Sequence, residues 1–318
     1  MLEVTRDDIL EAAERIAGLV ERTPLMETEI RGVRLWLKCE CLQTGGAFKL
    51  RGATNRLLQL SEEGRRRGVV AFSSGNHARG VAIAARRLGI PATIVMPSDA
   101  PQVKIDGTRS EGAEIVFYDR RTGDRAAIAA ELAAKGGATV VPSFDDARIV
   151  AGQGTVGLEV LDQLAEAGEA PPSRIVVPVG GGGLASGIAL ACLNAEIVGV
   201  EPEGWDDMRR SLELGAIVPV PKDAPPTLCD ALQTTLVSPI TFGILNKRGA
   251  RVVAVSEDDI IAAVRFAWEQ HGLVVEPGGA AALAALLSGV AEPADGTVAI
   301  VSGGNVDPAL HARIVGPV

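Results

Sequence analysis

Histidine, cysteine and lysine are all scarce in this chain of 318 residues. Three histidines argue against a metal or catalytic site built from several of them. The cysteines form no Cys-x-x-Cys pair, which argues against a zinc knuckle, a thioredoxin-like motif and a disulfide scaffold. We expect all four in or near the core: Cys39, Cys41, Cys192 and Cys229. Only six lysines stand against twenty-five arginines, so a lysine in an unusual setting is conspicuous.

Long apolar runs and long basic runs are missing too. No apolar stretch reaches the ~18 residues of a membrane span, and the segment Met1–Asp8 lacks the apolar core of a signal peptide. We therefore expect a cytoplasmic protein with no membrane partner. The formal net charge is −9, and the basic run Arg65–Arg67 resembles the solvated end of a helix. Nucleic acid is accordingly not an expected partner.

Short apolar runs alternate with amphipathic segments along the chain. The expected strands are Val33–Lys38, Val69–Phe72, Ala92–Met96, Glu114–Tyr118, Thr139–Val141, Arg174–Val179, Glu196–Val200, Arg251–Val255 and Thr297–Val301. The expected helices include Thr122–Lys135, Thr155–Ala167 and Glu257–Gln270, and Thr5 and Ser256 are expected helix caps. Strands this apolar need cover on both faces, so the pattern predicts an α/β fold with mainly parallel, doubly wound sheets.

The length suggests about two domains. Neither a repeat nor a low-complexity linker separates them, so we expect one domain to be inserted into the other. The short strand–helix units from Val69 to Val141 predict the inserted lobe. We place the large domain at residues 1–60 and 147–318, and the small domain at residues 68–145.

Lys49 lies in an unusual setting. It stands between Phe48 and Leu50, just after two glycines, at the start of an expected helix. A partly desolvated site lowers the pKa of a lysine and makes it a nucleophile or a Schiff-base former. From this segment alone, a surface lysine with its stem on apolar side chains is the favoured interpretation.

The segment Ser73–Gly80 follows the strand Val69–Phe72 and opens a helix. Open α/β sheets bind ligands at the carboxyl ends of their strands. Hydroxyl groups, an amide and free backbone N–H groups at a helix start suit an anion such as a carboxylate. A plain capped turn fits equally well, and we expect His77 to be a structural hydrogen-bonding residue rather than a base.

Four successive glycines, Gly180 to Gly183, precede Leu184 and a helix, after the strand Arg174–Val179. Such a run has a high entropic cost on folding. It makes sense where the backbone wraps closely round a phosphate at a helix N-terminus. No Lys-Ser/Thr pair follows, so the segment is not a nucleotide P-loop.

A second glycine pattern, Gly152–Gly157, matches the dinucleotide-binding spacing. No convincing strand precedes it, and no following strand ends in an acidic residue at the right distance. We therefore interpret these glycines as packing at the entry of a helix. An NAD-dependent dehydrogenase using them stays as an alternative from another class, although it leaves Lys49 and Gly180–Gly183 unexplained.

Polar residues follow two more expected strands. Ser302 to Asn305 place a hydroxyl beside glycines after the strand Thr297–Val301. Glu201 to Asp207 follow the strand Glu196–Val200, and carboxylates at that spacing suit a hard cation together with water and a carbonyl. An acidic helix cap explains the second segment as well.

Together these segments resemble the fold-type II pyridoxal-phosphate enzymes, specifically the serine/threonine dehydratase and serine racemase family. The matching segments, in family order, are Phe48–Ala53, Ser73–His77, Gly152–Thr155, Gly180–Gly183, Glu276-Pro277 and Ser302–Asp307. They run from about Thr23 to the C-terminus, and the combination favours the catalytic interpretation of Lys49. The resemblance implies two lobes, of which the smaller is mobile, and a homodimer.

The resemblance also implies a role for each matching residue. Lys49 would bind pyridoxal 5'-phosphate covalently and move the Cα proton, Gly180–Gly183 would cradle the phosphate, Asn76 would bond the ring hydroxyl and Ser302 would face the pyridine nitrogen. The remaining implied cofactor contacts are Phe48, Leu184 and Glu276. The implied substrate contacts are Ser73, Ser74, Gly75, Asn76, His77 and Arg125. The implied cation ligands, for Mg²⁺ or else Ca²⁺ or Mn²⁺, are Glu201, Asp207 and the carbonyl of Trp205.

Three departures from the family pattern bear on substrate and regulation. Ala47 replaces a frequent serine, which does not discriminate between branches, because alanine also occurs in hydroxyaspartate-cleaving members and some racemases. Ser143 replaces a histidine that is common before Phe-Asp-Asp, which leaves substrate details open. A C-terminal regulatory domain of the kind in biosynthetic threonine dehydratases is not expected, and neither is feedback by isoleucine.

The expected activity is an ammonia-lyase (dehydratase) that converts L-serine or L-threonine to a 2-oxo acid and ammonia. A serine at the pyridine nitrogen makes a weaker electron sink, which favours prompt loss of the β-hydroxyl group. No histidine or acid of the motifs is placed to protonate that group, so we expect the cofactor phosphate to do so. The alternatives are a serine racemase, with Ser74 as second proton carrier, and a 3-hydroxyaspartate dehydratase. A β-replacing synthase and a non-enzymatic binding protein are more distant alternatives.

Overall fold

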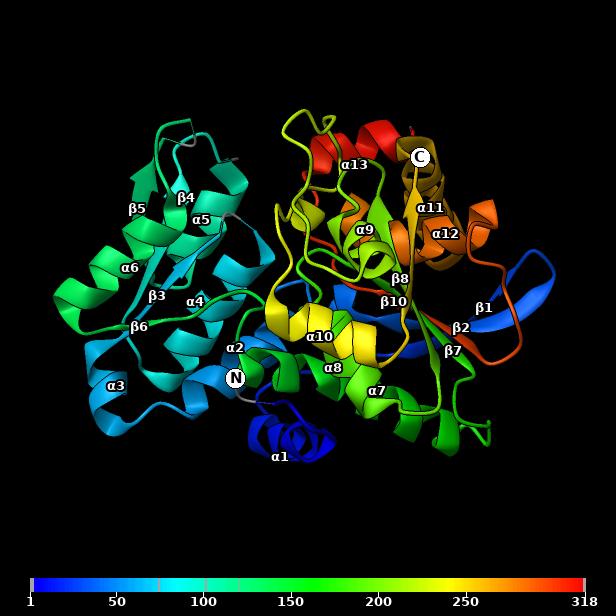
Figure 1. Cartoon of the computed structure of the whole chain (residues 1–318), viewed down its shortest axis with the longest axis horizontal. Coiled ribbons are helices and arrows are strands. Elements are labelled where there is room, and N and C mark those ends of the chain that lie inside the picture. Colours follow the sequence, from blue (N-terminus) through cyan, green and yellow to red (C-terminus); the bar gives the residue numbers. More distant parts are fainter. Residues whose placement is uncertain (1–2, 74, 101, 120, 317–318) are drawn as a thin grey trace.

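The computed structural model describes residues 3–73, 75–100, 102–119 and 121–316, and its two sheets lie side by side (Figure 1). The larger sheet has the order β1 (Leu25–Ile30), β2 (Val33–Cys39), β10 (Thr297–Val301), β7 (Arg174–Pro178), β8 (Glu196–Pro202), β9 (Arg251–Val255). The smaller sheet has the order β5 (Glu114–Tyr118), β4 (Ala92–Pro97), β3 (Val69–Phe72), β6 (Thr139–Val140). Only β1 and β2 pair antiparallel within these sheets. The predicted α/β fold with mainly parallel sheets is confirmed.

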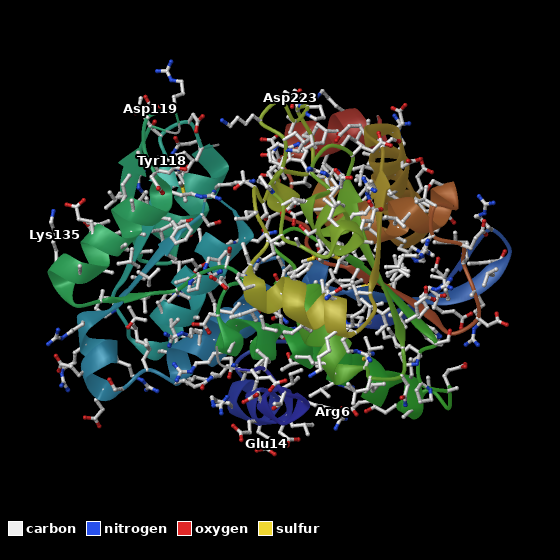
Figure 2. All side chains as sticks on the ribbon, viewed as in Figure 1. Arg6, Glu14, Tyr118, Asp119, Lys135 and Asp223 are labelled. Carbon is white, nitrogen blue, oxygen red and sulfur yellow. The ribbon has the colours of Figure 1, made fainter. Side chains whose placement is uncertain are left out.

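Helices cover both sheets. The α-helices are α1 (Arg6–Ile16), α2 (Lys49–Leu58), α3 (Glu62–Arg67), α4 (Asn76–Leu88), α5 (Gln102–Ser110), α6 (Arg125–Gly136), α7 (Ala147–Glu166), α8 (Gly183–Ala191), α9 (Asp207–Leu214), α10 (Pro239–Lys247), α11 (Glu257–His271), α12 (Ala281–Ser288) and α13 (Pro308–Val315). Short 3-10 turns are η1 (Glu40–Leu42), η2 (Asp230–Leu232) and η3 (Pro277–Ala280). Figure 2 shows Lys135, on the outermost helix α6, pointing away from the molecule. Within the described ranges, no helix is long and apolar enough to cross a membrane.

The larger sheet is covered on both faces because its strands are apolar at nearly every position. In β7, Val176 packs with α11 and α12, whereas Ile175 and Val177 pack with α1, α7 and α8. All four cysteines are buried and free, as predicted: Cys39, Cys41, Cys192 and Cys229. Alternate side chains of a strand point to opposite faces, so a continuous apolar strand needs helices on both.

Helices also cover both faces of the smaller sheet. Val69 and Ala71 of β3 pack with α2, α4 and α5, and Val70 packs with α6. The strands of this sheet lie between residues 69 and 140, whereas those of the larger sheet lie before and after this range. The exact domain boundaries, and the mobility of the smaller lobe, stay predictions.

Capping side chains set the helix starts. Thr5 and Ser256 each form a capping box, as the sequence predicts. The predicted starts at Thr122 and Thr155 are wrong. Asp124 accepts from two backbone N–H groups, so α6 begins at Arg125, and Asp146 does the same for α7, which begins at Ala147. Aspartate is a preferred cap residue, so both helix starts have a local signal in the sequence.

The glycine pattern Gly152–Gly157 lies inside α7 and not at a helix entry, which corrects its predicted place. These glycines permit close helix crossings. A Cβ added at Gly152 would lie 2.6 Å from Cα of Gly52 in α2, and one added at Gly154 would lie 2.9 Å from the carbonyl oxygen of Gly187 in α8. The run follows no strand, so it lacks the context of a dinucleotide site.

Candidate active site

The carboxyl ends of β3, β7 and β10 open onto one cavity of about 450 Å³. Ser73, Gly180 and Ser302 follow these strands and line the cavity. The other predicted cofactor and substrate residues that line it are Phe48, Lys49, Gly75, Asn76, His77, Arg125, Gly181, Gly182, Gly183, Leu184 and Glu276. Ser74 lies outside the described residues. The fold thus brings residues more than 250 positions apart into one site, as strand ends at a sheet edge do.

Lys49 is the first residue of α2 and projects into the cavity. Its Nζ donates a hydrogen bond to the carbonyl oxygen of Ser143 at 3.1 Å and lies 5.0 Å from the centre of the Phe48 ring. Burial lowers the pKa of Lys49 to about 8, and the charge of Glu276 opposes this shift. The amine is therefore partly neutral near neutral pH and able to act as a nucleophile or base.

The four glycines form a narrow cradle before α8. A Cβ added at Gly181 would lie 2.1 Å from Cδ1 of Phe144, and one at Gly183 would lie 3.1 Å from Phe144 Cβ. Gly182 caps α8 with a φ of +84°, a conformation that favours glycine. The first N–H groups of α8 find no acceptor within their own helix. A glycine cradle with free N–H groups suits a phosphate group.

A hydrogen-bonded chain of polar side chains crosses the cavity wall. Asn76 Nδ2 donates to Glu276 Oε1 at 2.5 Å, and Asn305 Nδ2 donates to Asn76 Oδ1 at 2.7 Å. Glu276 is only 2 % exposed. Burial, then the charge of Asp230, raises the pKa of Glu276 to about 7, against the opposing hydrogen bond from Asn76. An acid able to hold a proton therefore lines the cavity, and it is Glu276, one of the predicted cofactor contacts.

Ser302 and Phe48 are joined through the backbone. The N–H of Phe48 donates to the carbonyl oxygen of Ser302 at 3.2 Å. The N–H of Ser302 in turn donates to the carbonyl oxygen of Gly279 at 3.3 Å. Ser302 is 5 % exposed and lines the cavity. A serine hydroxyl in this place is a neutral partner for a ring nitrogen.

The start of α4 suits an anion. Gly75 is its cap and offers no side-chain oxygen, and the N–H of Gly75 donates to the Ser73 hydroxyl at 3.2 Å.

His77 Nε2 donates to the carbonyl oxygen of Val141 at 2.9 Å. Burial, then the charge of Lys49, lowers the pKa of His77 to about 3, so its ring is neutral. This geometry fits the expected structural role of the His77 side chain.

Two further cations line the cavity besides Lys49. Arg125 lies at the start of α6, with its guanidinium carbon 6.0 Å from the centre of the Phe72 ring. Lys104, from α5, forms an ion pair with Asp230 of η2. This pair joins a helix of the smaller sheet to the far side of the cavity. Sequence reasoning missed Lys104 and Asp230, because neither follows a predicted strand or belongs to a glycine motif.

The predicted cation ligands lie around the start of α9. Both oxygens of Glu201 accept backbone N–H bonds, from Met208 at 3.0 Å and Arg209 at 2.9 Å. Both oxygens of Asp207 are buried, and no donor of the described chain reaches them in hydrogen-bond geometry. Burial raises the pKa of Asp207 to about 7, which the nearby backbone N–H of Val237 opposes. An unpartnered buried carboxylate beside a second carboxylate fits a hard cation.

Two acidic side chains alone do not complete a cation site at the start of α9. In the described part of the chain, no group of three or more His, Cys, Asp or Glu side chains is arranged to hold a metal. The predicted set has only two such side chains, Glu201 and Asp207, and needs the carbonyl of Trp205 and water to complete it. The cation therefore stays a prediction.

Comparisons with known proteins find relatives over nearly the whole chain. A model of the pyridoxal-phosphate dependent enzyme family matches residues 16–303. An L-threo-3-hydroxyaspartate ammonia-lyase of Pseudomonas sp is 42% identical, with 97% of each chain covered. An L-threonine ammonia-lyase of Thermotoga maritima is 40% identical over 98% of this chain and 78% of the relative. The solved structure of maize serine racemase superposes with a TM-score of 0.91, at 36% identity, covering 98% of this chain and 97% of that one.

Proposed function

The chain belongs to the pyridoxal-phosphate-dependent enzymes, and from this premise we propose that it is an ammonia-lyase of small hydroxy amino acids. Its relatives include ammonia-lyases and serine racemases, so elimination or racemisation at a small amino acid is the shared chemistry of the group. We assign L-serine or L-threonine as substrate, with a 2-oxo acid and ammonia as products.

One observation carries the proposal: the amine of Lys49 and the cradle of Gly180–Gly183 line the same cavity. Lys49, with its lowered pKa, would hold the cofactor at one end, and the N–H groups at the start of α8 would hold its phosphate at the other. Ser302 and Asn76 would contact the ring between them. When bound, pyridoxal phosphate supplies an aldehyde for amines and an electron sink for a negatively charged Cα.

The residues of the chain divide the remaining work. Backbone N–H groups at the start of α4, with Ser73, would bind and orient the substrate carboxylate. The neutral amine of Lys49 would then take the proton from Cα. Glu276 lines the same cavity with a pKa near 7, so it can hold a proton close to the reacting groups.

L-threo-3-hydroxyaspartate is a second candidate substrate, since cations line the cavity beside the acids Asp145, Asp230 and Glu276. Lys104 and Arg125 line the cavity in addition to Lys49, and a second carboxylate group needs a cation nearby. The relative from Pseudomonas that carries this activity in its name supports the same assignment. Racemisation depends on Ser74 as second proton carrier, a role that stays a prediction.

We also propose that Mg²⁺ or a similar hard cation binds at Glu201, Asp207 and the Trp205 carbonyl. The unpartnered oxygens of Asp207 support this, since a bound cation would satisfy them. The cation would neutralise the buried negative charge of these carboxylates, which lie near the loop that leads into α10. The cytoplasmic location and the homodimer are further predictions.

The deciding experiment offers the purified protein, loaded with pyridoxal phosphate, each of L-serine, L-threonine and L-threo-3-hydroxyaspartate with their stereoisomers. It measures 2-oxo acid and ammonia, and D-serine in parallel. Formation of 2-oxo acid that requires Lys49 supports the proposal. A protein that yields none from any substrate, while showing a borohydride-reducible absorption band, would contradict the activity but not the cofactor.

A further inference from the structure

A buried ion cluster lies behind Lys49, outside the lining of the cavity. It contains Lys38, Glu40 and Arg51, each 0 % exposed, together with Glu159, whose side chain is 17 % exposed. Two positive and two negative charges make the cluster neutral. Charged side chains are almost never fully buried unless they are paired. A buried cluster of four such side chains therefore needs a structural or functional explanation.

Arg51 is the centre of the cluster, and two carboxylates each accept two hydrogen bonds from its guanidinium group. Its Nε and Nη2 donate to Oε2 and Oε1 of Glu40, both at 2.8 Å. Its Nη1 and Nη2 donate to Oε1 and Oε2 of Glu159, at 2.6 and 2.8 Å. Further bonds run to the Thr155 hydroxyl at 3.3 Å and the carbonyl oxygen of Glu21 at 3.1 Å. Two planar forks fix a guanidinium in both position and direction.

The two carboxylates come from a strand end and a long helix. Glu40 begins η1 directly after β2, and Glu159 lies in the middle of α7. Lys38 donates to Glu159 at 2.6 Å and to the carbonyl oxygen of Thr23 at 2.7 Å. Burial alone would raise the pKa of Glu40, but the charges of Arg51 and Lys38 outweigh it and lower this pKa, so Glu40 is ionised. The cluster therefore ties a strand end and a long helix to Arg51.

Arg51 is the third residue of α2, and Lys49 is the first. The first turn of this helix packs against α7 and α4 but has no side-chain cap. Phe48 stands at the cap position with helical backbone angles and makes no capping side-chain bond, whereas Ser, Thr, Asp or Asn usually fills this place. The backbone ties at this end are the N–H of Phe48 to the carbonyl oxygen of Ser302 and the N–H of Gly52 to Oε1 of Gln153. Something other than a cap must fix where the Lys49 amine lies.

Buried ion clusters seldom stabilise a protein more than apolar side chains of the same shape would. Their best-attested use is to fix one arrangement among several. We propose that Arg51 is a positioning residue, whose grip by Glu40 and Glu159 fixes the first turn of α2 and with it the place of the Lys49 amine in the cavity. The cluster is neutral and acts by geometry. This inference rests on the proposed role of Lys49.

The test compares two ends of one helix. Arg51→Met removes both forks, and Arg51→Lys keeps the charge but not the planar fork. Arg56→Met is the matched control, because Arg56 lies near the other end of α2 and pairs with Asp146 at 2.8 Å. The protein free of cofactor is reductively methylated at its amines with ¹³C-formaldehyde and cyanoborohydride, and titrated by NMR. Six lysines give few signals, and Lys49→Arg identifies the one that matters.

We expect both Arg51 variants to raise the pKa of Lys49 by about one unit toward its ordinary value, because a loosened first turn admits water to the amine. With cofactor bound, the absorption band of the lysine-linked group should also change with pH, and the midpoint of this change should differ from that of the wild type. Arg56→Met should lower the melting temperature and leave the pKa of Lys49 unchanged.

Folded Arg51 variants in which the pKa of Lys49 and the band both match wild type would overturn the inference. If Arg51→Met does not fold, Arg51→Lys and Glu159→Gln decide the question on the same readouts. A wild-type protein that binds no pyridoxal phosphate would refute the proposed function instead, while the amine titration would still decide the role of Arg51.

Discussion

The amine of Lys49 donates to the carbonyl oxygen of Ser143 at 3.1 Å, and this bond joins the first turn of α2 to the segment before α7. Ser143 is followed by Phe144, which packs against Gly181 and Gly183 of the glycine cradle. One short segment therefore touches both the amine and the phosphate cradle, the two ends of the proposed cofactor site. This relationship connects the chemistry of Lys49 to the shape of the cradle.

Lys49→Ala should abolish formation of 2-oxo acid, with a loss of ~10³-fold or more, because it removes the amine that would bind the cofactor and take the proton from Cα. Lys135→Ala is the matched control, since Lys135 is exposed at the end of α6 and should leave the rate unchanged. A variant at position 49 with wild-type turnover would refute the assignment of the base.

The reaction of the cofactor-free protein with pyridoxal phosphate should depend on pH in a defined way. Lys49 reacts as a free amine, and its pKa is lowered to about 8 by burial. The rate should rise about tenfold per pH unit below pH ~8 and level off above it. Stopped-flow absorbance at several pH values checks this, and a rate still rising steadily at pH 10 would show an ordinary lysine.

Gly181→Ala should weaken retention of the cofactor by about tenfold or more, because its methyl group would overlap the Phe144 ring, with Cβ 2.1 Å from Cδ1. Gly136→Ala is the control, as a Cβ there meets nothing within 4 Å. Dialysis followed by absorbance measures retention. Equal retention in the two variants would mean that the cradle is not the phosphate site.

Mg²⁺ should raise the melting temperature by about 2 °C or more, because a cation bound only to the folded state stabilises it. Asp207→Asn should remove this response, since it takes away the buried carboxylate that lacks a partner. Scanning calorimetry with Mg²⁺ and with a chelator provides the comparison. The same response in wild type and variant would place the cation elsewhere.

Lys104→Gln should raise KM for L-threo-3-hydroxyaspartate about tenfold and leave KM for L-serine nearly unchanged. The reason is that the second carboxylate loses a cation of the cavity wall, whereas serine has no such group. Lys222→Gln on an exposed loop serves as control. Equal effects on both substrates would argue for a structural role of the pair with Asp230.

The sequence predicted those parts of the site that follow strands. Ser73, Gly180 and Ser302 could be placed because the apolar runs before them predict parallel strands, and such sheets bind ligands at the carboxyl ends of their strands. Strand β1 was missed, since Leu25–Ile30 mixes charged and apolar residues and pairs only as an antiparallel edge. Polar edge strands carry a weak pattern.

Lys104, Asp230 and the ion cluster of Arg51 could not be found from the sequence. Their partners are far along the chain: 126 residues separate Lys104 from Asp230, and 108 separate Arg51 from Glu159. No local spacing encodes such a pair, because tertiary packing alone brings the groups together. Asp124 and Asp146, by contrast, were visible as caps and were overlooked.

The residues that line the cavity come from two different parts of the chain, and this bears on how such an enzyme diversifies. Gly180–Gly183 and Ser302 come from the larger lobe, whereas Ser73, Gly75 and Arg125 come from the segment that builds the smaller sheet. Under the proposed roles, the glycine cradle and the carboxylate-binding residues thus lie on separate stretches of chain, although Asn76 would contact the cofactor ring. Inherited or engineered changes at Ser73, Gly75 or Arg125 would therefore alter which amino acid is accepted while the glycine cradle stays intact.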